Sequence, residues 1–263
     1  MILRDWIDED QIDWFFLSRN KNAMNLLNAN PMKIDYYMLS YNENAMEILK
    51  ENINQINWSN LSENINAMEL LEANFNKIDW CYLVKNENAL KLLEKNFNKI
   101  DWMYIAFNKN AIKMIKKYPE RIRWDILSRN ENAMELIKKY STKISWYHLS
   151  ANPNKEAIEL LKVNFDKIVW SQLSTNPNKE AIKLLKSNID KIDWFWLSKN
   201  CNEIEFLEKN KDKLRWDALY SNPNIFTYDY KEIRGRNHDI NKAIIEWIWK
   251  PENIDKWKGL RLV

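Results

Sequence analysis

Residues 34–55, IDYYMLSYNENAMEILKENINQ, decide the fold because variants of the same pattern recur along the chain. An aromatic residue, here called the anchor, stands third in each copy, and successive anchors lie 22 residues apart except for two steps of 24. The anchors of repeats 1 to 10 are Trp14, Tyr36, Trp58, Trp80, Trp102, Trp124, Trp146, Trp170, Trp194 and Trp216. Self-similarity at this period is typical of a solenoid, in which each unit buries its apolar face against its neighbours.

Each repeat predicts two short helices. Apolar residues two before, at and three after the anchor, with an aspartate such as Asp13 as N-cap, indicate a first helix of one to two turns. A second helix is expected over runs such as residues 45–49, with Asn44 and Glu47 as a capping box and a left-handed residue at Asn52. The two longer repeats should extend the loop or first turn at residues 152–156.

Two unbroken asparagine columns follow the anchors. The column six residues past the anchor consists of Asn20, Asn42, Asn64, Asn86, Asn108, Asn130, Asn152, Asn176, Asn200 and Asn222. The second column stands two residues later, from Asn22 to Asn224. We interpret both as a structural ladder that satisfies loop carbonyls and helix N-termini, and the anchors, each with Leu or Ile three residues on, as core.

The predicted fold is an all-α solenoid of about ten repeats. Its helices are too short to be stable alone, so stacking has to stabilise them. Residues 1–12 are expected to form an N-terminal cap that covers the first repeat, residues 13–224 the solenoid, and residues 225–263 a C-terminal cap with a helix ended by Pro251. At about 8–10 Å per unit, the rod would be about 80–100 Å long.

Composition and motifs favour a non-enzymatic protein of the cytoplasm. The net charge of +3 is small for a dedicated nucleic-acid binder, and the sequence shows neither a signal peptide nor a membrane span. Cys81 and Cys201 occupy different repeat positions, and His148 and His238 are far apart, so no metal or cofactor site and no catalytic pair is expected.

The unit W-x-x-L-S-x-N-x-N-A resembles the repeat proteins that giant DNA viruses of protists encode in many copies. The resemblance extends over residues 12–263 and includes Asp229, Tyr230 and the stretch from Pro251 to Trp257. It implies a viral protein of the host cytoplasm, within the viral factory, or of the virion. A weaker similarity to leucine-rich variant repeats, which alternate α and 3₁₀ helices, implies that one helix of each pair is partly 3₁₀.

Variable positions one, two and five residues past the anchor are the candidate partner-binding surface. The candidates at these positions are Phe15, Phe16, Arg19, Tyr37, Tyr41, Tyr82, Tyr104, Phe107, Tyr147, His148, Phe195 and Trp196, and the strip also includes Met38, Met103 and Lys199. Such a strip suits a peptide or partner helix, although one of these positions could instead contribute to the core. We therefore expect a scaffold for protein–protein interaction, with single-stranded nucleic-acid binding at one base per repeat, or a structural role in the virion, as alternatives.

Overall fold

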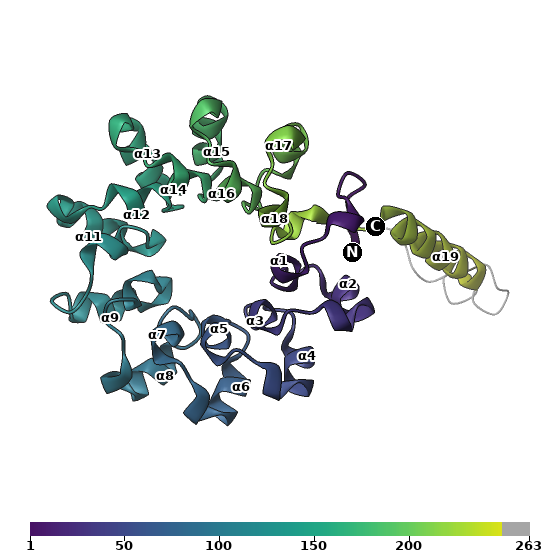
Figure 1. Ribbon diagram of the computed structural model, residues 1–263, viewed down its shortest axis with the longest axis horizontal. Coiled ribbons are helices and arrows are strands. Elements are labelled where there is room, and N and C mark those ends of the chain that lie inside the picture. Colours follow the sequence, from purple (N-terminus) through teal and green to yellow (C-terminus); the bar gives the residue numbers. More distant parts are fainter. Residues whose placement is uncertain (249–263) are drawn as a thin grey trace, which may run out of the picture. The chain divides into compact units, whose positions relative to one another are not determined.

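The computed structural model describes residues 1–248, which form two compact units. The larger unit, residues 5–225, contains all ten repeats and is an all-α solenoid, as the sequence predicts. The chain of this unit curves through a full turn, so that repeat 10 returns to repeat 1 and the unit is a closed ring (Figure 1). The smaller unit consists of residues 1–4 and the segment that starts at Phe226.

The first helix of each repeat lies on the inner side of the ring and begins at or near the anchor (Figure 1). Aspartates cap several of them as expected: Oδ1 of Asp13 accepts from the backbone N–H groups of Phe15 and Phe16. The inner helices are α1 (Trp14–Ser18), α3 (Tyr36–Leu39), α5 (Trp58–Glu63), α7 (Trp80–Leu83), the 3₁₀ helix η6 (Ile105–Phe107), α10 (Trp124–Leu127), α12 (Trp146–Ser150), α14 (Trp170–Ser174), α16 (Trp194–Ser198) and α18 (Trp216–Leu219).

The second helices form the outer layer. They are α2 (Met24–Ala29), α4 (Met46–Glu51), α6 (Met68–Ala73), α8 (Leu90–Lys95), α9 (Ile112–Lys117), α11 (Met134–Lys139), α13 (Lys155–Val163), α15 (Lys179–Lys186) and α17 (Ile204–Glu208). The two longer repeats add their extra residues at the start of α13 and α15, where Asn154 and Asn178 act as N-caps. This is the loop or first-turn extension that the sequence predicts.

Most outer helices are followed by a 3₁₀ turn that leads to the next anchor. These turns are η2 (Pro31–Lys33), η3 (Ile53–Gln55), η4 (Phe75–Lys77), η5 (Phe97–Lys99), η9 (Ser141–Lys143), η10 (Phe165–Lys167), η11 (Ile189–Lys191) and η12 (Lys211–Lys213). Three further 3₁₀ turns lie in the loops after the inner helices: η7 (Lys109–Ala111), η8 (Glu131–Ala133) and η13 (Pro223–Ile225). Most of the 3₁₀ helices are therefore separate turns between helices. In repeat 5, however, the inner helix η6 is itself a 3₁₀ helix.

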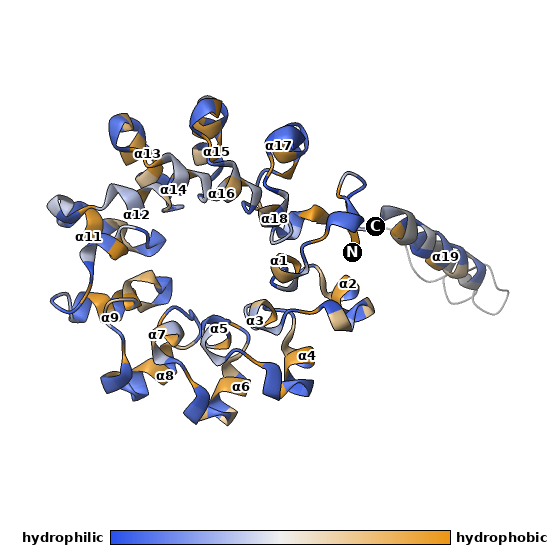
Figure 2. Ribbon diagram, in the orientation of Figure 1, coloured by the Kyte–Doolittle hydropathy of each residue, from blue (hydrophilic) through white to orange (hydrophobic). Residues whose placement is uncertain are grey.

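The core consists of buried apolar residues of both helical layers, in which Figure 2 shows hydrophobic positions. The residue three past the anchor is fully buried in every repeat, for example Leu17 and Leu127. The alanine that precedes α2, α4, α6, α8, α9 and α11, such as Ala45, and a Leu or Ile four residues later, such as Leu49, complete this core. Burial of these columns drives the stacking of helices that are too short to persist alone.

The aromatic anchors are only half-buried, so the prediction that they are core residues is incomplete. Nine of them stand at the first position of an inner helix, and Trp102 lies three residues before η6. A lysine of the following 3₁₀ turn lies over the anchor ring in several repeats: Nζ of Lys99 lies 4.7 Å from the Trp80 ring centroid, and Lys143 lies 4.8 Å from that of Trp124. These cation–π contacts join the start and the end of one repeat.

The first asparagine column is a continuous hydrogen-bonded ladder. In each repeat, the side-chain Nδ2 donates to two backbone carbonyl oxygens of the preceding repeat, as Asn108 does to Val84 and Asn86 at 3.0 and 2.9 Å. The Oδ1 accepts the N–H of the residue two positions on, here Asn110 at 3.0 Å. All three hydrogen-bonding sites of this buried amide are satisfied, which confirms the structural reading of the column.

The second asparagine column forms a parallel ladder of single bonds. Nδ2 of Asn44 donates to the Lys21 carbonyl at 2.9 Å, and Asn66 donates to that of Glu43 in the same way. The prediction that these residues start capping boxes is wrong in the shorter repeats, because α4 and α6 begin after Ala45 and Ala67 and have no side-chain N-cap bond. The amide is already engaged with the preceding repeat.

The left-handed conformation predicted at Asn52 and its equivalents is also wrong. Asn52 has φ −119° and ψ 45°, and no residue with positive φ occurs in the described part of the chain. Its Nδ2 instead donates to the Ile48 carbonyl at 2.9 Å, and the equivalent bond recurs at Asn96 and Asn164. The side chain thus satisfies a carbonyl of the last helical turn without a glycine-like backbone.

The ladder continues across the two ends of the repeat array, which corrects the expectation of an 80–100 Å rod. Asn20 of repeat 1 donates to the carbonyls of Tyr220 and Asn222 of repeat 10 at 3.0 and 2.9 Å. Asn22 likewise donates to Pro223 at 2.9 Å. These are the bonds that every other repeat makes with its predecessor, so the curvature per repeat is large enough to close the array.

The N-terminal segment packs on repeat 10 rather than covering repeat 1 alone as expected. The rings of Trp6 and Trp216 meet edge to face at 6.1 Å, and the Tyr220 hydroxyl donates to the Asp8 carbonyl at 3.1 Å. The 3₁₀ turn η1 (Glu9–Gln11) precedes the Trp14 anchor as η2 precedes Tyr36. Residues 5–12 therefore supply to repeat 10 the turn that its own chain lacks.

The smaller unit contains the only strands of the described residues. β1 (Ile2–Leu3) and β2 (Phe226–Thr227) pair antiparallel, with Ile2 opposite Thr227 and Leu3 opposite Phe226. α19 (Tyr230–Ile248) follows, so a long helix is present in the predicted C-terminal segment. Its expected end at Pro251 and the stretch to Trp257 lie outside the described residues.

Candidate binding site in the centre of the ring

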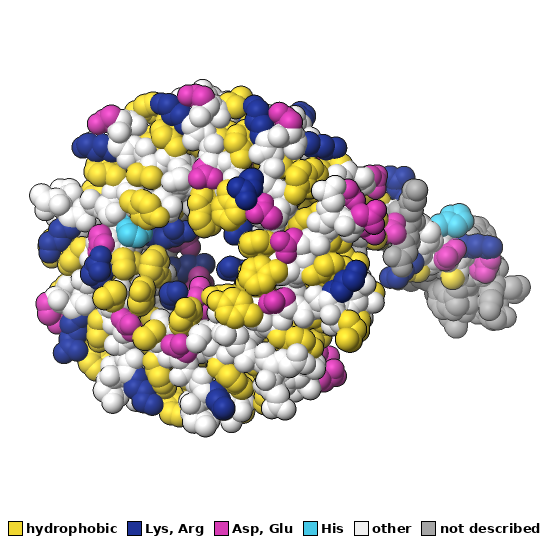
Figure 3. Space-filling view, in the orientation of Figure 1, with side chains coloured by type: hydrophobic (Ala, Val, Ile, Leu, Met, Phe, Trp, Pro, Cys, Tyr) yellow, Lys and Arg dark blue, Asp and Glu magenta, His cyan; other side chains and the backbone are white. Residues whose placement is uncertain are grey.

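The inner helices surround a narrow central opening, around which the space-filling view shows apolar, basic and acidic side chains (Figure 3). A cavity of about 300 Å³ lies there, with lining residues from repeats 1, 2, 6, 8, 9 and 10. The lining residues are Phe16, Arg19, Met38, Arg129, Thr175, Trp196, Lys199, Asn200 and Ser221. Ring closure thus brings residues distant in sequence to one site, which we call the lumen.

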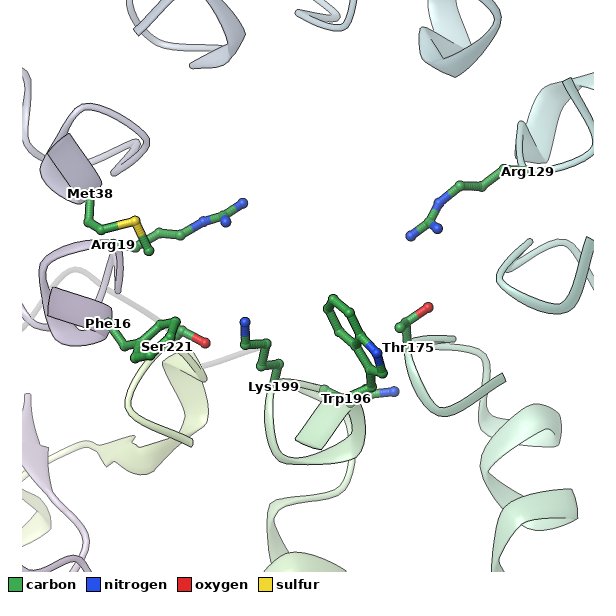
Figure 4. A pocket seen from close by; sticks show the side chains of 9 residues that line it. Phe16, Arg19, Met38, Arg129, Thr175, Trp196, Lys199 and Ser221 are labelled. Carbon is green, nitrogen blue, oxygen red and sulfur yellow. The ribbon is translucent and has the colours of Figure 1, made fainter. Parts of the chain in front are cut away.

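Three positively charged side chains extend into the lumen from different directions (Figure 4). Arg19 and Arg129, five repeats apart, approach from opposite sides, and Lys199 extends between them from α16. Each occupies the position five past its anchor. This position lies at the C-terminal end of an inner helix, from which a long side chain reaches towards the ring centre.

The lumen has an excess of positive charge. Within the described residues, no salt bridge includes Arg19, Arg129 or Lys199. Glu63, the acidic member of the same column, is paired with Lys85 at 3.3 Å. Arg129 is held by the Gln172 side chain, whose Oε1 accepts from it at 3.4 Å.

Burial destabilises the charged forms of Lys199 and Arg129. Desolvation lowers the pKa of Lys199 from its usual value, and the nearby positive charge of Arg19 lowers it further, whereas the negative charge of Asp217 raises it. Desolvation also lowers the pKa of Arg129. The lumen therefore keeps these two cations in a partly desolvated space, where neither forms a salt bridge with the described residues.

Aromatic rings flank two of the three cations. The Arg19 guanidinium lies 4.5 Å from the Tyr41 ring centroid, and Nζ of Lys199 lies 4.9 and 5.3 Å from those of Phe16 and Trp196. Burial, followed by the charge of Glu63, raises the pKa of Tyr41 to about 12, so its hydroxyl stays protonated and can donate. The rings hold the cations in place and offer faces on which a planar ligand could stack.

A second aromatic cluster lies on the inner helices of repeats 4 to 7. Nζ of Lys85 lies 4.7 and 5.5 Å from the centroids of Tyr82 and Tyr104, and Tyr104 stacks on Phe107 at 6.3 Å. Phe107 meets the His148 ring edge to face at 6.3 Å, although the two residues lie two repeats apart. The inner curvature thus brings non-adjacent repeats into contact.

Three candidates one past the anchor, Phe15, Tyr37 and Tyr147, are exposed. Phe15 stacks on Tyr37 of the next repeat at 6.4 Å, and the Tyr147 hydroxyl accepts from Gln172 at 3.0 Å. Phe195 is half-buried beside Trp196, at 5.2 Å. These side chains form an apolar border beside the lumen residues of the same helices.

The alternative that one variable position contributes to the core is correct in part for the position two past the anchor. Met38 and Ile126 are buried there, and so are the polar Asn60 and Gln172. In contrast, Trp196 at the same position is exposed and lines the lumen. Some residues of this column therefore pack in the core, and others are available to bind a ligand or partner.

The structure adds lumen residues that the candidate set lacks. Arg129, Thr175 and Ser221 belong to the same column as Arg19, five past the anchor. The sequence signal that could have identified these three residues was their position five past an anchor. Their meeting with Arg19 depends on ring closure, which the order of repeats along the chain does not reveal.

Groups with chemical reactivity have ordinary structural roles. The Ser145 hydroxyl lies 3.1 Å from Nδ1 of His148, but Ser145 is the N-cap of α12 and accepts the His148 N–H. Cys81 and Cys201 are free thiols, and burial raises the pKa of Cys81 above its usual value. Among residues 1–248, no group of three or more His, Cys, Asp and Glu side chains is arranged to hold a metal ion.

Neither the described helices nor the known proteins indicate a further site. Among the helices described, none combines the length and the apolar character needed to cross a bilayer. Comparison with protein families, curated proteins and solved structures found no match. The geometry of the ring is therefore the evidence for a binding site. Cationic and aromatic side chains line the lumen, and the residues that recur in every repeat hold the repeats together.

Proposed function

We propose that this chain is a non-enzymatic binding ring that recognises a segment of another protein through side chains of its inner helices. Support comes from large apolar side chains that the fold leaves in contact with water. The exposed fractions are 41% for Phe15, 51% for Tyr37, 45% for Met103, 51% for Tyr147 and 38% for Trp196. Aromatic residues and methionine are enriched in protein interfaces, where a few of them supply most of the affinity.

An extended segment suits the ring better than a partner helix. An α-helix with its side chains is about 10–12 Å wide. Side chains from opposite sides of the ring line one cavity of about 300 Å³, so little of a helix would fit among them. An extended segment can place alternate side chains on the exposed rings of Phe15 and Tyr37 and on the cluster around Tyr104.

The resemblance of the repeat unit to giant-virus proteins supports a partner of host or viral origin. The ring would meet this partner in the cytoplasm of an infected cell or within the virion. A structural role in the virion is compatible with such binding. Mass spectrometry of purified particles tests that location, because a virion component is recovered in a fixed ratio to the other structural proteins.

The experiment that tests the proposal compares two double variants in affinity purification from infected cells, followed by binding measurements with the purified partner. Tyr104→Ala with Phe107→Ala removes two half-buried inner rings, and Phe75→Ala with Phe165→Ala removes two exposed rings from the 3₁₀ turns η4 and η10. We expect the inner pair to lose the partner and the outer pair to retain it. Equal recovery by the two variants would refute the assignment of the inner surface.

A second candidate, single-stranded nucleic-acid binding, is favoured by the combination of lumen cations and aromatic rings. Arg19, Arg129 and Lys199 offer phosphate contacts, and Phe16 and Trp196 offer faces for bases. A filter-binding assay over a range of salt concentrations separates the two functions. Contacts with single-strand phosphates release counterions at about 0.7 per contact, so affinity would fall steeply with salt.

A further inference from the structure

The three lumen cations lack the salt-bridge partners that other cations of the ring have. Lys21, Lys50 and Lys116 all pair with carboxylates of adjacent repeats. Arg19, Arg129 and Lys199, in contrast, face one another across a cavity and form no salt bridge within the described residues. Like charges held in a partly desolvated space destabilise the empty ring, and such locally unfavourable arrangements are found at binding sites.

We propose that the lumen binds a compact small molecule carrying two or more phosphate groups, which Arg19, Arg129 and Lys199 hold jointly. The planar fork of each guanidinium matches phosphate oxygens in a bidentate fashion, and the Lys199 ammonium adds a third, more flexible donor. The Tyr41 ring lies 4.5 Å from the Arg19 guanidinium, and Thr175 lines the same cavity.

Size and direction favour a small ligand over a polymer. The cations approach from repeats 1, 6 and 9 and converge on one cavity, whereas the charges of an extended acidic peptide follow a line with about 3.3–3.6 Å per residue. The volume of about 300 Å³ is at the lower end of small-molecule pockets. A compact polyphosphate places its negative charges where all three cations reach them.

The test measures binding of sodium tripolyphosphate and of ATP to the full chain by isothermal titration calorimetry. Arg129→Gln removes one of the three cations and the bond to Gln172 and leaves an uncharged polar side chain at this position. The matched control is Lys95→Gln, on the outer helix α8, where Lys95 is exposed and outside the salt bridges of the described residues. We expect Arg129→Gln to weaken tripolyphosphate binding about 10- to 100-fold, the range of one charge-assisted hydrogen bond, and Lys95→Gln to leave it unchanged.

The two probes distinguish an inorganic polyphosphate from a nucleotide. Trp196→Leu removes an exposed ring beside Lys199 but no charge. Loss of ATP affinity with unchanged tripolyphosphate affinity assigns a nucleotide, with its base on Trp196. Unchanged affinity for both assigns a polyphosphate without a base. Both results retain the phosphate site.

Three results would overturn the proposal: no detectable binding of either probe, equal binding by wild type and Arg129→Gln, or tighter binding of an oligothymidylate than of tripolyphosphate. The last result would assign the lumen to nucleic acid. Lys199→Gln repeats the test at a second position, and a thermal midpoint no lower than wild type shows that each variant is folded. Because Tyr104→Ala with Phe107→Ala leaves all three cations in place, tripolyphosphate binding by that variant separates this site from the proposed protein-binding surface.

Discussion

The side chain of Asn20 donates a 2.9 Å hydrogen bond to the backbone carbonyl of Asn222, which lies nine repeats further along the chain. The same bond joins Asn42 to Asn20 at 3.0 Å and Asn108 to Asn86 at 2.9 Å. The contact between the two ends of the repeat array is therefore chemically the same as the contact between any two consecutive repeats. The inner surface is consequently a closed lumen, and not an open concave face.

The buried ladder should dominate the effect of asparagine substitutions on stability. Asn108→Ala removes three hydrogen bonds of the buried loop, two to backbone carbonyls and one from the Asn110 N–H, and is expected to lower the free energy of unfolding by about 1–3 kcal/mol. Asn54→Ala, at an exposed position, should lower it by under about 0.5 kcal/mol. Chemical denaturation of both variants checks this, and equal midpoints would contradict the structural role of the column.

Closure makes a prediction about Asn20 that an open solenoid does not make. In the ring, Asn20→Ala removes two hydrogen bonds to repeat 10, as Asn42→Ala removes two to repeat 1, so both should cost about 1–3 kcal/mol. In an open array, the Asn20 amide would face water and its loss would cost much less. A denaturation midpoint for Asn20→Ala close to wild type, beside a clear loss for Asn42→Ala, would rule out the closed seam.

His148 should make stability depend on pH in the mildly acidic range. Burial lowers the pKa of its imidazole below the usual value of 6.5, so the unfolded chain binds a proton more readily than the folded ring. Stability is therefore expected to fall as pH drops below about 6.5 and to be unaffected by this group at higher pH. His148→Gln should flatten this part of the stability curve, and an NMR titration that gives the imidazole a pKa at or above 6.5 would contradict the burial argument.

Local features were predictable because short-range chemistry determines them. The Asp13 cap, the buried Leu17 column and the extra turn at Asn154 follow from capping and hydrophobic spacing within one or two repeats. The backbone conformation of Asn52 was not predictable in this way. Its side chain caps the helix through the Ile48 carbonyl and removes the need for a left-handed residue. Asn44 was misread as an N-cap because its partner, the Lys21 carbonyl, belongs to another repeat.

Global closure was not predictable from the repeat pattern. It depends on a small rotation per repeat that accumulates over ten units, and no single residue encodes that rotation. The candidate surface was consequently predicted from each repeat separately, and Arg19 was part of that prediction. Arg129 was missed because only the closed ring brings it opposite Arg19.

The most direct test of the closed ring is a distance across the seam, measured by electron–electron double resonance. Spin labels at Asn28 of α2 and Glu208 of α17, in a Cys81→Ser and Cys201→Ser background, probe exposed positions that are equivalent in their repeats and two repeat steps apart across the seam. The matched pair, Asn28 and Glu72 of α6, lies two steps apart along the chain. The ring predicts similar distance distributions for the two pairs. A seam distance beyond the range of the method, with the matched pair still measurable, would show an open solenoid and contradict the account.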